Sequence, residues 1–96
     1  MANNSLRVVE TDRFKQEARE LLALSPGNPV EGLIWALRRN PYFGQRVKGS
    51  DRMVAVAYRQ DFAYLIYYVV SEGTVTLESV LQRKTPIAPG PLGIET

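Results

Sequence analysis

Three consecutive segments in the second half of the chain carry the patterns of β-strands, and they constrain the fold most strongly. Residues 63–70 are apolar on both faces, which is typical of a central strand covered on both sides. Residues 53–58 precede this run and residues 74–81 follow it, and both interleave apolar with polar side chains. Because the connections at 59–62 and 71–73 are short, we expect an antiparallel three-stranded meander.

The first part of the chain predicts one short strand followed by a helix. Residues 6–9 are rich in β-branched residues, and Thr11 or Asp12 is suited to cap the helix that follows. The apolar residues of this helix recur at the spacing of one helical face: Phe14, Ala18, Leu21 and Leu22. The "SPGNP" segment at 25–29 ends the pattern.

A second helix is predicted to begin at Asn28, which is a favourable N-cap followed by Pro29 and, three residues after the cap, Glu31. Asn40 and Pro41 end it. Its buried stripe is expected to contain Val30, Leu33, Ile34 and Leu37. Two helices joined by so short a link favour an antiparallel hairpin.

The order β-α-α-β-β-β predicts an α+β fold in which the helical hairpin packs on one small antiparallel sheet. Residues 42–52 are predicted to be a loop. We expect one domain over residues 1–84. Residues 85–96 contain prolines and glycines and predict a loose tail that is dispensable for folding.

The composition excludes several kinds of chemistry. The chain has no cysteine and no histidine, so disulfides, thiolate metal sites and histidine catalysis are excluded, and we expect no metal and no cofactor. No secretory leader is visible, and the longest apolar run, "FAYLIYYVV", has nine residues, too few to span a bilayer. We expect a cytoplasmic protein with no membrane association.

Positive charge is concentrated in residues 38–59, where six basic side chains and one acidic one give +5. Such a segment attracts phosphate or an acidic protein partner, although a solvated loop has the same composition. Arg46, Lys48 and Arg52 are the candidates within the predicted loop, where Gly44 and Gly49 permit close backbone approach.

Over about residues 8–84, the predicted order of elements resembles the RelE/ParE toxin superfamily. Two stretches carry the resemblance: "NPYFGQRVKG" at 40–49 is similar to its helix-to-sheet link, and "AYLIYYVVSEGTVTLESVLQRK" at 63–84 is similar to its ending. The resemblance implies a growth-inhibiting toxin of a bacterial type II toxin–antitoxin (plasmid stabilisation) system. It further implies a cognate antitoxin, with a homodimer or a toxin–antitoxin hetero-oligomer as the assembled state.

Two branches of this superfamily differ in their target. RelE-like members cleave mRNA in the ribosome, whereas ParE-like members inhibit DNA gyrase. In an ungapped comparison, the strand lysines of the nuclease branch fall on Ala55 and Ala57, and its strand arginine falls on Tyr64. Gln82 in "VLQRK" stands where ParE-like chains usually carry histidine. The resemblance therefore favours the ParE-like branch and a function in binding, with no efficient ribonuclease activity.

Four residues remain as candidates for a catalytic role: Arg59, Tyr67, Arg83 and Lys84. Arginine is effectively always protonated, so this set favours phosphate or target binding over acid–base catalysis. The predicted target- or phosphate-binding set is Arg46, Lys48, Arg52, Arg59, Arg83 and Lys84.

Two groups of aromatic residues have alternative interpretations. Trp35 lies off the apolar stripe of its helix and is either an antitoxin contact or a residue packed under the sheet edge. Four tyrosines form either a stacking surface for single-stranded nucleic acid or part of the core, and strand alternation favours the core: Tyr58, Tyr64, Tyr67 and Tyr68. Alternation places Tyr64 and Tyr68 on one face and Tyr67 on the other.

Three hypotheses follow from the sequence. The first is a ParE-like toxin that acts by binding gyrase. The second is a RelE-like endonuclease that acts on ribosome-bound mRNA, and the third is a non-toxic interaction domain that keeps the fold.

Overall fold

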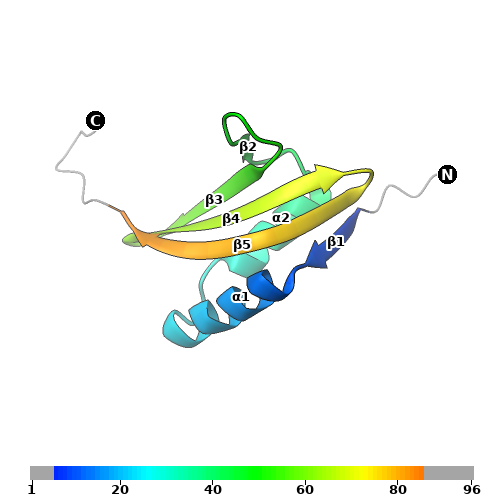
Figure 1. The fold of residues 1–96 in the computed structure, drawn as a ribbon. Coiled ribbons are helices and arrows are strands. Elements are labelled where there is room, and N and C mark those ends of the chain that lie inside the picture. The colour runs from blue at the N-terminus through cyan, green and yellow to red at the C-terminus, as the bar shows by residue number, and fades with distance from the viewer. Residues whose placement is uncertain (1–5, 86–96) are drawn as a thin grey trace.

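The computed structural model describes residues 6–85, which form two helices and one five-stranded sheet. In chain order the elements are β1 (Arg7–Glu10), α1 (Asp12–Leu24), α2 (Val30–Arg39), β2 (Gln45–Arg46), β3 (Met53–Arg59), β4 (Phe62–Ser71) and β5 (Thr74–Lys84). The strand order is β1-β5-β4-β3-β2, and both helices lie on one side of the sheet (Figure 1). The α+β class is confirmed, and the predicted β-α-α-β-β-β order is confirmed except for one additional short strand, β2.

The sheet differs from the prediction in two respects. It is mixed rather than antiparallel, because β1 pairs in parallel with β5. In addition, Gln45 and Arg46, predicted to be loop residues, form the short strand β2, which pairs antiparallel with Met53 and Val54. The backbone N–H of Val47 donates to the carbonyl of Arg52 at 2.8 Å and closes the connection between β2 and β3.

The last strand is longer than the sequence pattern indicated. Its apolar alternation ends near Leu81, but β5 remains paired with β4 to the end, where Lys84 lies opposite Phe62. Backbone pairing continues because it does not depend on apolar side chains. The hydroxyl of Thr85 then donates to the carbonyl of Asp61 at 2.9 Å, and the rest of the predicted tail lies outside the described residues.

The core lies between the two helices and one face of the sheet. Its largest fully buried side chains are Tyr64, Tyr68, Phe14, Leu37, Ile66, Leu77 and Val75. The predicted stripe of α2 is buried except for Ile34, which is partly exposed. Leu22, expected on the buried face of α1, is 59% exposed. The apolar face of α1 is therefore narrower than its sequence pattern suggested.

Capping side chains fix where both helices begin. The Thr11 hydroxyl accepts from the backbone N–H of Phe14 at 3.1 Å, and it also lies within hydrogen-bonding distance of two β5 carbonyls, so the start of α1 is fastened to the sheet. The side-chain oxygen of Asn28 accepts from the N–H of Val30 at 2.9 Å. Asn28 thus acts at the start of α2, although Pro29 occupies the N-cap position itself.

Beyond the end of β1, a side chain from α1 closes the outer edge of β5. The Glu17 carboxylate accepts hydrogen bonds from the backbone N–H of Val80 at 3.0 Å and from the Ser79 hydroxyl at 2.8 Å. Both donors lie next to an irregularity in the pairing of β4 with β5. An unpaired edge N–H is a template for unwanted strand pairing, and the carboxylate occupies it.

This arrangement lowers the pKa of Glu17. Burial raises the pKa, but the hydrogen bonds from Val80, Ser79 and Arg13 together outweigh burial and hold it below its usual value of 4.5. A carboxyl whose pKa is lowered in the folded state adds stability at pH values above the unfolded-state pKa. That contribution is lost as the pH falls through the lowered pKa.

We therefore expect Glu17→Gln to lower the free energy of unfolding by about 1 kcal/mol at pH 7. The difference from wild type should shrink below about pH 4, as Glu17 of the wild type becomes protonated. Thermal unfolding followed by circular dichroism between pH 3 and pH 7 measures both effects. Glu20→Gln is the matched control, because Glu20 accepts an exposed hydrogen bond from Gln16 on the same helix. Equal losses in the two variants at every pH would contradict this role.

Candidate functional site

The face of the sheet opposite the helices is not covered by any element of the described chain. We call this surface the open face. Residues paired across neighbouring strands share a face, so the register places three rows of side chains on it. These rows are Val54–Tyr67–Ser79, Val56–Leu65–Leu81 and Tyr58–Ala63–Arg83. The open face is therefore apolar in its middle, with Tyr58 and Arg83 at one end.

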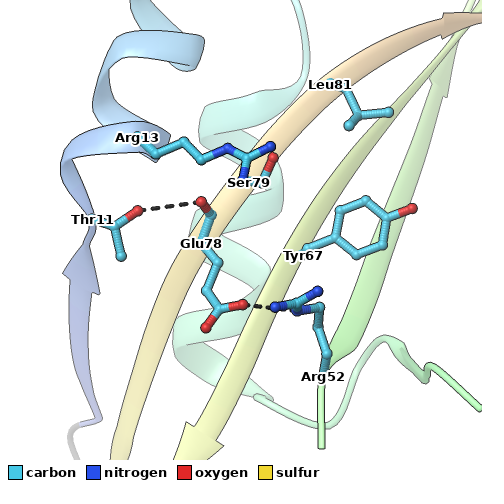
Figure 2. A pocket seen from close by; sticks show the side chains of 7 residues that line it. All are labelled: Thr11, Arg13, Arg52, Tyr67, Glu78, Ser79 and Leu81. Carbon is cyan, nitrogen blue, oxygen red and sulfur yellow. Dashed lines mark hydrogen bonds and ion pairs between the residues drawn. The ribbon is translucent and has the colours of Figure 1, made fainter. Parts of the chain in front are cut away.

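A groove of about 450 Å³ lies at the other end of the open face, beside the first turn of α1. Figure 2 shows the side chains that line it. These are Thr11, Arg13, Arg52, Tyr67, Glu78, Ser79 and Leu81. Tyr67 and Leu81 supply apolar surface, and the remaining residues are polar or charged.

Two ion pairs orient the charged side chains around the groove. The Nε of Arg52 lies 2.8 Å from a carboxylate oxygen of Glu78, and this contact crosses from the start of β3 to β5 (Figure 2). The Nε of Arg13 lies 3.1 Å from Glu17 within α1. Both arginines are more than half exposed, at 73% for Arg13 and 53% for Arg52, so solvent weakens the pairs. The pairs position two guanidinium groups at the groove.

The structure separates the predicted binding residues into three places. Arg52 and Tyr67 lie at the groove, and Arg83 lies on the same face at the opposite end. Arg59 and Lys84 belong to rows on the helix side of the sheet, and the guanidinium of Arg59 lies near Gly27 in the α1–α2 link. The last two, Arg46 and Lys48, are exposed on the β2–β3 hairpin. The six residues do not form one cluster.

Gln82, at the position where ParE-like chains usually carry histidine, has a structural contact. Its side-chain amide donates to the Tyr64 hydroxyl at 3.0 Å, and the Ser25 hydroxyl lies 2.8 Å from the same oxygen. The three side chains join β5, β4 and the end of α1. The three polar residues at the end of β5 therefore lie on two faces of the sheet: Gln82 and Lys84 face the helices, and Arg83 lies on the open face.

The positions compared with the nuclease branch lie on the helix side of the sheet. Ala55 and Tyr64 are 0% and 1% exposed, and Ala57 packs against the core. Open-face positions of β3 and β4 are one residue away, at Val54, Val56 and Leu65, and they are apolar. The ungapped comparison therefore used positions that a substrate on the open face does not reach.

The aromatic residues separate as strand alternation predicted. Tyr64 and Tyr68 are buried in the core, whereas Tyr67 faces the groove and Tyr58 is exposed on the open face. Trp35 is 61% exposed on α2, with the guanidinium carbon of Arg39 at 4.6 Å from the centre of its ring. The alternative in which Trp35 packs under the sheet edge is wrong.

Sequence reasoning missed five residues of the groove: Thr11, Arg13, Glu78, Ser79 and Leu81. Arg13 lies outside the apolar stripe of its helix, and nothing in its spacing indicates a place beside the sheet. The irregularity in the β4–β5 pairing, which changes the register at Tyr67/Tyr68, corresponds to no recognisable pattern in the sequence. Of these five residues, only Leu81 could have been assigned to the open face from the sequence, through the alternation of its strand.

The groove is suited to binding. Its cations are arginines, which do not exchange protons near neutral pH, and its carboxylate is paired with Arg52. No group of three potential metal ligands occurs within residues 6–85. None of the helices in this range is long and apolar enough to cross a membrane.

One helical pair lies on one face of a sheet with the strand order β1-β5-β4-β3-β2, which is an α+β fold. A solved structure of this fold, the solution structure of a conserved hypothetical protein, HP0894 from Helicobacter pylori, is similar to this chain. The TM-score is 0.53 at 17% sequence identity, over 81% of this chain and 94% of that one. No family model and no curated protein matches the sequence. The likeness therefore shows the fold.

Proposed function

We propose that the protein is the toxin component of a bacterial type II toxin–antitoxin pair, that it acts by binding a macromolecular target, and that a cognate antitoxin neutralises it. The observation that supports binding is the open face, an uncovered apolar sheet surface with arginines at both ends. Its apolar side chains are partly exposed, and uncovered apolar surface of this kind is typical of interaction sites. The RelE/ParE-like fold supports the toxin class.

The ParE-like mode of action, with gyrase as the target, agrees best with the side chains present. Cleavage of RNA needs one group that accepts a proton from the 2′-hydroxyl and another that protonates the leaving oxygen. The middle of the open face carries Val54, Val56, Leu65 and Leu81, which do neither. A RelE-like endonuclease is the alternative that the experiment below must separate.

The decisive experiment expresses the protein in bacteria without an antitoxin and follows DNA and protein synthesis separately. Growth should stop, and DNA synthesis should fall before protein synthesis does. If protein synthesis fails first and mRNA is cut at codon positions, the endonuclease alternative holds. Unimpaired growth at a confirmed expression level would overturn the toxin proposal.

A substitution on the open face tests where the target binds. Leu81→Glu places a charge between Leu65 and the groove, and we expect about ten-fold weaker growth inhibition, since a carboxylate must be desolvated in the complex. Leu24→Glu is the matched control, because Leu24 is 80% exposed at the end of α1. Thermal melts establish that both variants fold. If the two folded variants are equally toxic, the open face is not the surface that binds the target.

A further inference from the structure

A second surface, distinct from the open face, extends from the second half of α2 through its link to β2. We call it the aromatic–arginine surface. It consists of six exposed residues: Trp35, Arg38, Arg39, Tyr42, Phe43 and Arg46. In Figure 1, α2 lies behind the sheet, and the chain continues from it through the link to β2 at the edge of the sheet.

The charge of this surface has one sign. The chain carries no acidic side chain between Glu31 and Asp51. Arg38 and Arg39 occupy the last turn of α2, where positive charge offsets the helix dipole. The dipole alone accounts for these two arginines, and no ligand is needed to explain them. Arg46 lies beyond the helix, and Lys48 follows it on the same hairpin, so the dipole does not explain these two cations. The surface is therefore suited to an anionic partner.

Three large aromatic rings are exposed among these cations. Trp35, Tyr42 and Phe43 are 61%, 66% and 49% exposed, and none belongs to the core. Asn40 holds the link that carries Tyr42 and Phe43. Its backbone carbonyl accepts from the N–H of Phe43 at 3.0 Å, and its side-chain oxygen accepts from the N–H of Tyr42 at 3.1 Å. The rings are thus presented on an ordered turn.

We infer that the aromatic–arginine surface binds single-stranded nucleic acid. Each nucleotide supplies a phosphate for a cation and a flat base for an aromatic ring, and this surface offers both kinds of group within one short stretch. A peptide with acidic side chains alone would satisfy the cations but leave three aromatic rings without a matching group. Arg39 already stacks on one side of Trp35 and holds the ring in place for a base. This inference goes beyond the proposed toxin activity and does not depend on it.

Trp35 is the only tryptophan in the chain, so its fluorescence reports on this surface alone. A twelve-nucleotide oligouridylate is the probe. We expect it to quench Trp35 on binding, because a stacked base lies against the indole. The logarithm of the binding constant should fall with the logarithm of salt concentration with a slope of about −2, as for roughly three neutralised phosphates.

Variants locate the binding site through the anisotropy of a labelled oligouridylate. Trp35→Leu should weaken binding about five-fold or more, as loss of one stacked base implies. Arg38→Ala combined with Arg46→Ala should weaken binding further and make the salt dependence shallower. Arg7→Ala combined with Arg19→Ala is the control, since it removes equal charge from exposed positions on β1 and α1. Melting curves show that each variant is folded.

Three results would overturn the inference. The first is no quenching of Trp35 when the labelled probe binds, which would place the probe elsewhere. The second is that the control pair of substitutions weakens binding equally, which would show that binding depends only on the net charge of the protein. The third is poly-glutamate binding with the same affinity and the same dependence on Trp35, which would identify an acidic protein, such as an antitoxin segment, as the partner.

Discussion

Replacing Gly44 with alanine should destabilise the protein by about 3 kcal/mol or more, and this is the largest effect we expect from adding a single methyl group. A Cβ at this position would meet the backbone carbonyl oxygen of Val54 well inside contact distance, and it would lie 2.7 Å from the hydroxyl oxygen of Tyr68. The first obstacle is backbone in β3, which cannot turn aside as a flexible side chain can. The sheet or the α2–β2 link must shift.

Gly32→Ala provides the matched comparison. Gly32 lies inside α2, and a Cβ there meets no atom within 4 Å. Because alanine favours the helix more than glycine does, this variant should be stabilised by about 0.5–1 kcal/mol. Urea titrations of both variants measure the two effects, which have opposite signs. A Gly44→Ala protein as stable as wild type would show that the link moves freely away from β3.

Tyr68→Phe should lower the free energy of unfolding by about 1–3 kcal/mol. The buried hydroxyl donates to the carbonyl of Pro41 at 2.8 Å and accepts from the N–H of Gly44 at 3.0 Å. It therefore fastens the link after α2 to the middle of the sheet. Phenylalanine keeps the ring in the core but leaves both backbone groups of the link without this partner. Tyr58→Phe is the control, because Tyr58 is exposed.

The Tyr68 hydroxyl also predicts a dependence on alkaline pH. Burial raises the pKa of Tyr68 above 10.0, although the hydrogen bond from Gly44 acts in the opposite direction. The neutral phenol is favoured in the folded state, so its contribution is present below pH 10 and is lost as the pH rises through the raised pKa. Wild type should lose stability more steeply than Tyr68→Phe in that range. Parallel pH profiles above pH 10 would contradict this.

Much of the fold was predictable because it rests on local periodicity. Strand alternation placed Tyr64 and Tyr68 on one face and Tyr67 on the other, as observed. Helical spacing identified Phe14 and Leu37 as core residues. The direction of β1 was not predictable in this way, since a four-residue strand pairs in either direction until its partner is known.

The candidate site was harder to predict, because it depends on contacts between distant segments. Arg52 pairs with Glu78 across 26 residues, and Ser79 bonds to Glu17 across 62. The concentration of positive charge in residues 38–59 predicts a binding segment as a whole. It carries no information about which side of the sheet each residue faces. In the sequence alone, Arg59 and Arg83 are equivalent cations, whereas the strand register places them on opposite faces of the sheet.

The position of β5 in the sheet has a consequence for biosynthesis. This strand lies between β1 and β4 and pairs with both, yet within residues 6–85 it is the last strand to be synthesised. Until residues 74–84 have left the ribosome, β1 has no neighbour to pair with and one edge of β4 is bare. The pairing of Arg7 with Thr74 also joins residues that are far apart in the chain. The interior of the sheet can therefore be completed only after nearly all of residues 7–84 have been synthesised.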